Sequence, residues 1–133
     1  MKLKNSTILF LGDSITEGVG VSDVSKRFTD LIAERTGAIC INYGVSGSRI
    51  AHQHAFDPTQ RHDRDFCMRA EEMQREADCI VIFGGTNDYD HGDAPFGSFS
   101  DRTPMTFRGA LHTLYTYLTE NYVGIPVVVI TPL

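Results

Sequence analysis

A chain of 133 residues with a net charge of −5 is long enough for one domain with a single core, but it lacks the basic excess that general nucleic-acid binding requires. Its apolar fraction of 41% and charged fraction of 22% are ordinary for a globular protein, and no apolar run reaches the length of a membrane span. The three cysteines (Cys40, Cys67 and Cys79) show no metal-type spacing, so we expect reduced thiols. The apolar run after residues 1–7 is too short for a signal peptide, so we expect a cytoplasmic protein.

The first predicted element is a buried strand of a parallel sheet, because the apolar run Ile8–Leu11 stops abruptly at Gly12. Ser14 follows just past the carboxyl end of this strand, where open α/β sheets bind their ligands. On this stretch alone, Ser14 is either a nucleophile or the cap of a following helix.

Two helices and two strands are predicted in the middle of the chain. Apolar side chains at helical spacing indicate helices over residues 24–36 and 65–76, and short apolar runs indicate strands over residues 38–42 and 79–83. Arginines around the second helix alternate with acidic residues and are interpreted as a solvated helix face: Arg61, Arg64, Arg69 and Arg75.

The C-terminal third begins with a predicted long loop over residues 89–103, and loops of this length in a small domain are usually functional. Thr103 is the expected cap of a helix from Pro104 to about Asn121. A fourth buried strand follows at Val127–Ile130. The resulting βαβαβαβ order predicts an α/β fold, with a parallel sheet covered by helices on both faces.

Three short motifs end the first three strands. They are Gly12-Asp13-Ser14, the pattern Asn42-x-Gly44-x-Ser46-Gly47, and Gly84-Gly85-Thr86-Asn87-Asp88. In this order they resemble the first three sequence blocks of the SGNH hydrolases, also called GDSL-type lipases and esterases. The resemblance implies a flavodoxin-like three-layer α/β/α domain of strand order 2-1-3-4, with the fifth strand of the family missing.

The same resemblance implies hydrolysis of a carboxylic ester, carrying a short acyl group or an acetyl group on a carbohydrate, without a cofactor. Ser14 would be the nucleophile, and its own N–H can face the same pocket. Gly47 would donate its backbone N–H to the developing oxyanion, and Asn87 would donate its side-chain amide.

Three further polar residues are candidates for holding these loops in place. Asp13 and Asp88 either accept hydrogen bonds from loop backbone or are ordinary turn residues. Asn42 is expected to tie the second loop to the first.

The general base of the family, a histidine in a C-terminal Asp-x-x-His block, has no counterpart at the expected place. The one literal match, Asp88 to His91, lies directly against the third motif. His91 is therefore interpreted as a surface or substrate-contact residue, with the role of base left as an alternative, and Arg49 could contact an acidic substrate. We expect residues 1–133 to form a single domain lacking its C-terminal part, weak or inactive as an enzyme, with an apolar fourth strand that favours self-association.

Other kinds of site remain open alternatives. His52 and His54, with His62 and several aspartates nearby, invite a metal interpretation, but no third ligand has a fixed spacing relative to the pair, so no metal site is predicted. These histidines are instead interpreted as a polar wall of the substrate cleft. A non-catalytic domain that binds a small molecule would need the same pocket without the base. A flavin- or nucleotide-binding domain of the same topology would place its phosphate loop at residues 12–18, where no Gly-x4-Gly-Lys-Ser/Thr motif occurs.

Overall fold

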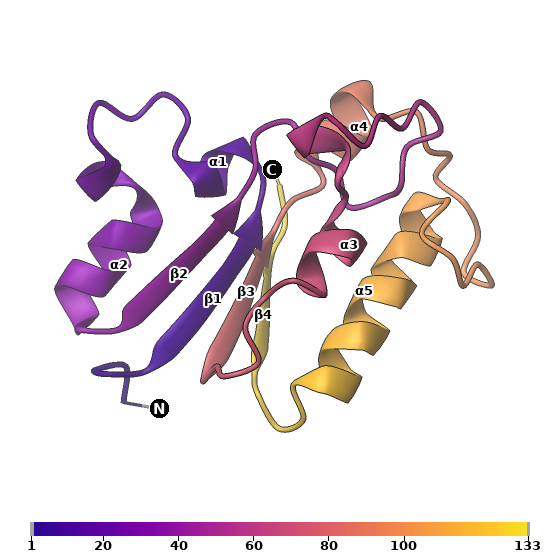
Figure 1. Ribbon diagram of the computed structural model, residues 1–133. Coiled ribbons are helices and arrows are strands. Elements are labelled where there is room, and N and C mark those ends of the chain that lie inside the picture. Colours follow the sequence, from indigo (N-terminus) through magenta and orange to yellow (C-terminus); the bar gives the residue numbers. More distant parts are fainter. Residues whose placement is uncertain (1, 133) are drawn as a thin grey trace.

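The computed structural model describes residues 2–132 and contains a four-stranded parallel sheet with helices on both of its faces (Figure 1). The strands are β1 (Thr7–Gly12), β2 (Ile39–Gly44), β3 (Cys79–Phe83) and β4 (Val127–Ile130). They lie in the order β2-β1-β3-β4, and every neighbouring pair is parallel. The predicted fold class and strand order are therefore confirmed.

The two faces of the sheet are covered by different helices (Figure 1). On one face α2 (Phe28–Thr36) packs against the sheet, and the ring of Phe28 meets that of Phe10 edge-on at 5.6 Å. On the other face lie α3 (Phe66–Ala70) and α5 (Phe107–Asn121). Because successive strand residues point to opposite faces, β1 contributes side chains to both layers.

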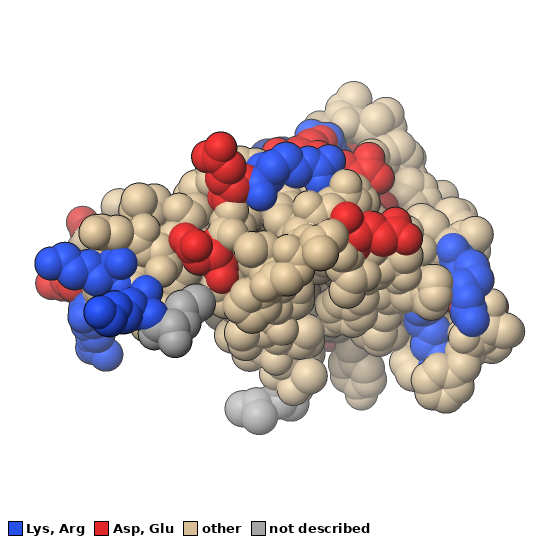
Figure 2. Space-filling model, turned by 90° about the horizontal axis from the view of Figure 1, so that it is seen from below, with Lys and Arg blue, Asp and Glu red and all other residues tan. Residues whose placement is uncertain are grey.

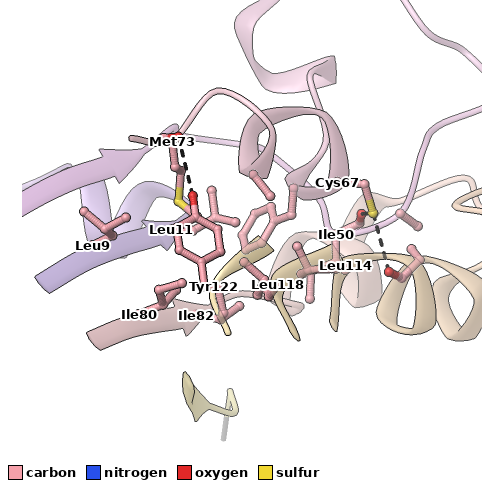
Figure 3. Packing of buried hydrophobic residues seen from close by; sticks show 14 residues of the cluster. Leu9, Leu11, Ile50, Cys67, Met73, Ile80, Ile82, Leu114, Leu118 and Tyr122 are labelled. Carbon is pink, nitrogen blue, oxygen red and sulfur yellow. Dashed lines mark hydrogen bonds between the residues drawn. The ribbon is translucent and has the colours of Figure 1, made fainter. Parts of the chain in front are cut away.

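The larger part of the core lies between the sheet and α5 (Figure 3). Leu9 and Leu11 of β1, with side chains of β3, face Leu114 and Leu118 of α5, and all four leucines are fully buried. Truncating a buried leucine of this kind to alanine costs about 2–5 kcal/mol. This layer fixes the sheet whose carboxyl edge carries the three motifs.

The helix predicted over residues 65–76 is much shorter in the structure. It is α3, Phe66–Ala70, capped by Asp65, whose carboxylate accepts from the N–H of Met68 at 2.9 Å. Beyond it, tyrosine hydroxyls bind the backbone of Gln74: the hydroxyl of Tyr43 accepts from its N–H, and that of Tyr122 donates to its carbonyl. These long-range bonds replace the helical ones, so the prediction is wrong beyond Ala70.

The other helix boundaries also differ from the prediction. The segment 24–36 splits into a 3-10 turn, η1 (Val24–Lys26), and α2, because Arg27 between them is extended with ψ of 144°. The predicted cap Thr103 is wrong: α5 begins three residues after Pro104, and Thr106 caps it by accepting from the N–H of Gly109 at 3.1 Å. The loop expected from residue 89 starts later, because α4 spans Thr86–His91.

Charges of both signs are interspersed on the face shown in Figure 2, with a broad uncharged surface between them. No continuous basic patch covers that face, in keeping with the net charge of −5. Within residues 2–132, no helix combines the length and the apolar composition needed to cross a bilayer.

Candidate active site

The three sequence motifs meet at one end of the sheet, where β1, β2 and β3 end (Figure 1). Ser14 is the first residue of α1 (Ser14–Glu17), Gly47 lies in the loop after β2, and Asn87 lies in α4 after β3. Hydrogen bonds join these segments directly. The N–H of Val45 donates to the carbonyl of Gly12 at 3.0 Å, and the amide of Asn87 donates to the carbonyl of Ser48 at 3.0 Å.

The turn that carries Ser14 is tight and is capped by its neighbour. The buried carboxylate of Asp13 accepts from the N–H of Ile15 at 3.0 Å, so Asp13 and not Ser14 caps α1. A Cβ atom on Gly12 would lie 2.0 Å from the hydroxyl oxygen of Thr16, so the turn requires glycine there. The hydroxyl of Ser14 is half-buried and has no hydrogen-bond partner among the described residues.

Three N–H donors on the loops at this edge of the sheet are suited to a developing negative charge. Gly47 has a φ of 78°, and neither its N–H nor that of Ser14 has an acceptor within the described part of the chain. One hydrogen of the Asn87 side-chain amide donates to the carbonyl of Ser48, and the second has no acceptor among the described residues. Backbone and amide donors of this kind are the usual components of an oxyanion hole.

Asn42 joins the second loop to the first through both ends of its amide. Its nitrogen donates to the carbonyl of Thr16 at 2.6 Å and to the hydroxyl of Thr29 at 3.0 Å. Its oxygen accepts from the N–H of Gly44 at 2.8 Å. One side chain therefore connects β2, α1 and α2.

Asp88 performs a similar task between the second and third loops. Its two carboxylate oxygens accept from the N–H groups of Ile50 and Ala51, each at 2.9 Å. Burial raises the pKa of Asp88 above its ordinary value of 3.8, against the lowering effect of these two bonds. Burial also raises the pKa of Asp13, which the N–H of Ile15 and the charge of Arg69 partly offset.

Arg69 contradicts the interpretation of the four arginines as a solvated helix face. It is 6% exposed, its guanidinium donates to groups of both motif loops, and burial lowers its pKa to about 10. The sequence did carry a signal for this position. Arg69 lies three residues after Phe66 and four before Met73, so it shares the helix face that was predicted to be buried.

No histidine is placed as a base for Ser14 in residues 2–132, where none lies within hydrogen-bonding distance of its hydroxyl. His91 is exposed and its ring contacts Asp90 at 3.1 Å, whereas the carboxylate of Asp88 is already bound to the second loop. The literal Asp-x-x-His match is therefore not a catalytic pair in this arrangement.

Arg49 and His52 each have an acidic partner within the fold. The guanidinium of Arg49 donates to the carboxylate of Asp63 at 3.0 Å, so its charge is matched within the fold. The ring of His52 lies 2.9 Å from the carboxylate of Asp65. Considering residues 2–132, no group of three or more His, Cys, Asp or Glu side chains is placed to hold a metal ion.

His62 lies beside the second loop. A Cβ atom on Gly47 would lie 3.2 Å from the Cβ of His62, so the two residues are in contact. The 3-10 turn η2 (Arg61–Asp63) carries His62, and its ring lies 3.6 Å from the carboxylate of Asp63. The sequence shows that position 62 is a histidine, but nothing in it indicates that His62 contacts Gly47.

The sequence as a whole matches a known protein family. The sequence profile of the GDSL-like lipase/acylhydrolase family matches residues 10–133. The chain belongs to this family. Among curated proteins, none matches the chain significantly.

Solved structures similar to this family member cover nearly all of it. A protein from Lactobacillus plantarum is 33% identical with a TM-score of 0.81, and the match spans 98% of this chain and 57% of that one. A protein described as a GDSL-like lipase, from Bacteroides uniformis, is 24% identical with a TM-score of 0.80, over 96% of this chain and 71% of its own. The SGNH-hydrolase family esterase AlinE4 is 21% identical with a TM-score of 0.65, over 95% of this chain and 58% of its own.

The last two similarities show the shared fold. The GDSL-family chain described here spans less than three fifths of the length of the Lactobacillus protein.

Proposed function

We propose that this chain carries the chemistry of a serine ester hydrolase, with Ser14 as the nucleophile. The observation that supports this most directly is the half-buried, unpartnered hydroxyl of Ser14 at the end of β1. It belongs to the same edge of the sheet as the backbone N–H groups of Ser14 and Gly47, which have no acceptor within the described residues, and the side-chain amide of Asn87, which has one hydrogen without an acceptor there.

In the proposed reaction, the oxygen of Ser14 attacks the carbonyl carbon of an ester and its proton passes to a base. The carbonyl oxygen becomes an oxyanion that accepts from the N–H groups of Ser14 and Gly47 and from the amide of Asn87. One such donor stabilises a transition state by roughly 2.7–4 kcal/mol in a well-studied hydrolase. The alcohol then leaves with a proton, and water releases the acid from the acyl-serine, so no cofactor is needed.

The substrate we propose is a small-molecule ester with a short acyl group, an acetyl group on a carbohydrate being one case. A pocket of about 290 Å³ adjoins the third motif and has room for a small group: it is lined by Gly85, Asp88, Tyr89, Ala94, Phe96 and Phe107, and its lining does not include Ser14. This volume lies at the lower end of the range for small-molecule sites.

A fluorophosphonate probe tests the nucleophile. We expect slow labelling of the 133-residue chain at Ser14, located by mass spectrometry of peptides, and no labelling of Ser14→Ala. Labelling of Ser14→Ala at the same rate would remove the proposal. Because no base is placed in residues 2–132, turnover of p-nitrophenyl acetate should be barely above background.

A second candidate function is non-catalytic binding of a small molecule in the same place. The observation that favours it is that no histidine reaches the hydroxyl of Ser14 within residues 2–132. The two candidates differ in the probe experiment. A binding domain would retain a short-chain carboxylate without forming the phosphonyl-serine.

A further inference from the structure

A single buried guanidinium connects the segments that build the candidate site. Arg69 donates from one terminal nitrogen to the carbonyl of Gly12 at 3.1 Å and to the hydroxyl of Ser48 at 2.7 Å. Its other terminal nitrogen donates to the carbonyl of Tyr43 at 2.6 Å, and its ε nitrogen donates to the carbonyl of Arg64 at 3.0 Å. The planar guanidinium therefore donates hydrogen bonds to β1, β2, the second loop and the segment before α3.

These acceptors are adjacent to the reacting groups. Gly12 precedes the nucleophile by two residues, and Ser48 directly follows the glycine that offers its N–H. The carbonyl of Ser48 in turn accepts from the amide of Asn87. A continuous chain of hydrogen bonds therefore runs from the nucleophile turn through Arg69 and Ser48 to the third motif.

The surroundings of Arg69 are unusual for an arginine that only stabilises a fold. Among the residues that the structure describes, no carboxylate lies within 4.0 Å of its guanidinium, and the ring of Phe66 lies 4.9 Å beneath it. Burying a cation against neutral acceptors is costly, because the water that it loses is not replaced by an opposite charge. The nearest acids, Asp65 and Asp13, act on it only at longer range.

From this geometry we infer that Arg69 is a positioning residue of the esterase site, which holds the nucleophile turn and the oxyanion loop in the mutual arrangement that the reaction requires. The inference rests on the proposed function, because it assigns to Arg69 the task of aligning Ser14 with its donors. Lysine cannot replace it, since one ammonium group cannot reach Gly12, Tyr43 and Ser48 in fork geometry.

The test compares four forms of the 133-residue chain: wild type, Arg69→Met, Ser48→Ala and Leu118→Ala. Ser48→Ala removes the hydroxyl that accepts from Arg69, together with the bond that this hydroxyl donates to the carbonyl of Val45 at 2.6 Å, and serves if Arg69→Met does not fold. Leu118 is buried in α5 away from the loops, so Leu118→Ala controls for lost stability alone. Circular dichroism first defines a temperature at which each form used is folded.

The first readout is the concentration dependence of fluorophosphonate labelling, in which Ser14 oxygen bonds to phosphorus, fluoride leaves and the hydroxyl proton passes to solvent. We expect Arg69→Met to lower the maximal labelling rate at least tenfold with less than a twofold change in half-saturating probe concentration. Ser48→Ala should lower it less, and Leu118→Ala should leave it unchanged. An unchanged maximal rate in both Arg69→Met and Ser48→Ala would overturn the inference, as would an equal loss in Leu118→Ala.

The second readout does not depend on reactivity. In ¹H–¹⁵N spectra, the backbone amide of Gly47 and the side-chain amide of Asn87 should shift or broaden in Arg69→Met and in Ser48→Ala, but not in Leu118→Ala. If the fluorophosphonate probe does not react with wild type, the proposed function alone is contradicted. If the signals of the Gly47 and Asn87 amides stay in place in both Arg69→Met and Ser48→Ala, the positioning role is contradicted. The two failures are thus distinguishable.

Discussion

The side-chain amide of Asn87 has two hydrogens, of which only one has a partner in the fold. One donates to the carbonyl of Ser48, and the other has no acceptor among the described residues. We therefore expect Asn87→Ala to lower the maximal rate of Ser14 labelling by about 10²–10³ while leaving half-saturation much less changed. The exposed Asn121 at the end of α5 offers a control, since Asn121→Ala should not affect labelling.

A loss confined to half-saturation would instead make Asn87 a residue that binds the ligand without stabilising the transition state.

The electrostatic interaction between Asp13 and Arg69 predicts that the free energy of unfolding depends on pH. The pKa of Asp13 in the fold is raised above its ordinary value of 3.8, so its stabilising contribution is fully present below that pH and is lost as pH rises through the raised value. The charge of Arg69 limits this loss because it favours the carboxylate. In Arg69→Met the pKa of Asp13 rises further, so the variant should lose more stability at pH 7 than at pH 4.

Urea unfolding of wild type and Arg69→Met at both pH values measures this difference. Asp65 also interacts with the charge of Arg69, so the comparison is repeated in an Asp13→Asn background. There the pH dependence of the Arg69→Met loss should shrink. Equal losses at pH 4 and pH 7 in the wild-type background would exclude the coupling.

The residues of the candidate site were predictable to different degrees. The motifs at Ser14, Gly47 and Asn87 are local and follow strand ends, so their common edge could be inferred from a parallel sheet. The partners of Asp88 could not, because Ile50 and Ala51 lie 38 and 37 residues away in an irregular loop. The prediction for Arg69 is wrong because the charge of arginine favours a solvated face, whereas its position three residues after Phe66 places it on the buried face.

At the scale of elements, β2 and α1 approach so closely that glycine is required between them. A Cβ atom on Gly44 would lie 2.1 Å from the backbone nitrogen of Glu17 and 2.6 Å from the carbonyl carbon of Thr16. Backbone cannot yield as a flexible side chain does, so Gly44→Ala should cost about 1–3 kcal/mol of unfolding free energy, as overpacking does. Because α1 begins with Ser14, labelling of Ser14 should fall as well.

Gly20→Ala is the matched control for this prediction. Gly20 has a φ of 88° but no atom within 4 Å of an added Cβ, so alanine there costs about 1–2 kcal/mol of local backbone strain. It should therefore lower stability in urea unfolding without slowing Ser14 labelling. Similar labelling in Gly44→Ala and wild type would show that α1 tolerates the displacement.

The accuracy of the predicted elements follows from what stabilises each of them. The four strands are short apolar runs, so composition alone revealed them. Layers on both sides of the sheet bury β1 and β3. The prediction that the fourth strand is buried is wrong, because β4 pairs with a neighbour on one side only and Val128 to Ile130 are exposed. The helices depend more on distant contacts. The backbone beyond α3 bonds to the hydroxyls of Tyr43 and Tyr122, which no local pattern announces. The six residues of α4 carry no apolar periodicity either, since Tyr89 is the one large hydrophobic side chain among them.

At the scale of the whole molecule, β4 is an edge of the sheet in the described part of the chain, and it is strongly apolar. It pairs with β3 on one side, and Val128 and Val129 are each 47% exposed. An exposed, hydrophobic edge with unpaired backbone groups is a template for pairing with another chain. We therefore expect the 133-residue chain, of 14.8 kDa, to associate with itself through β4.

Sedimentation over a range of protein concentrations tests this expectation, with Val128→Lys as the deciding variant. A lysine on an edge strand opposes pairing because the approaching strand would have to desolvate its charge, so Val128→Lys should remain monomeric where wild type associates. Val123 lies off the strand in the turn after α5 and is 80% exposed, so Val123→Lys adds the same charge without touching the edge. That control should still associate, because the substitution leaves β4 intact and changes the net charge of the chain only from −5 to −4. Wild type that stays monomeric at every concentration, or equal dissociation by both lysines, would show that β4 is not the contact.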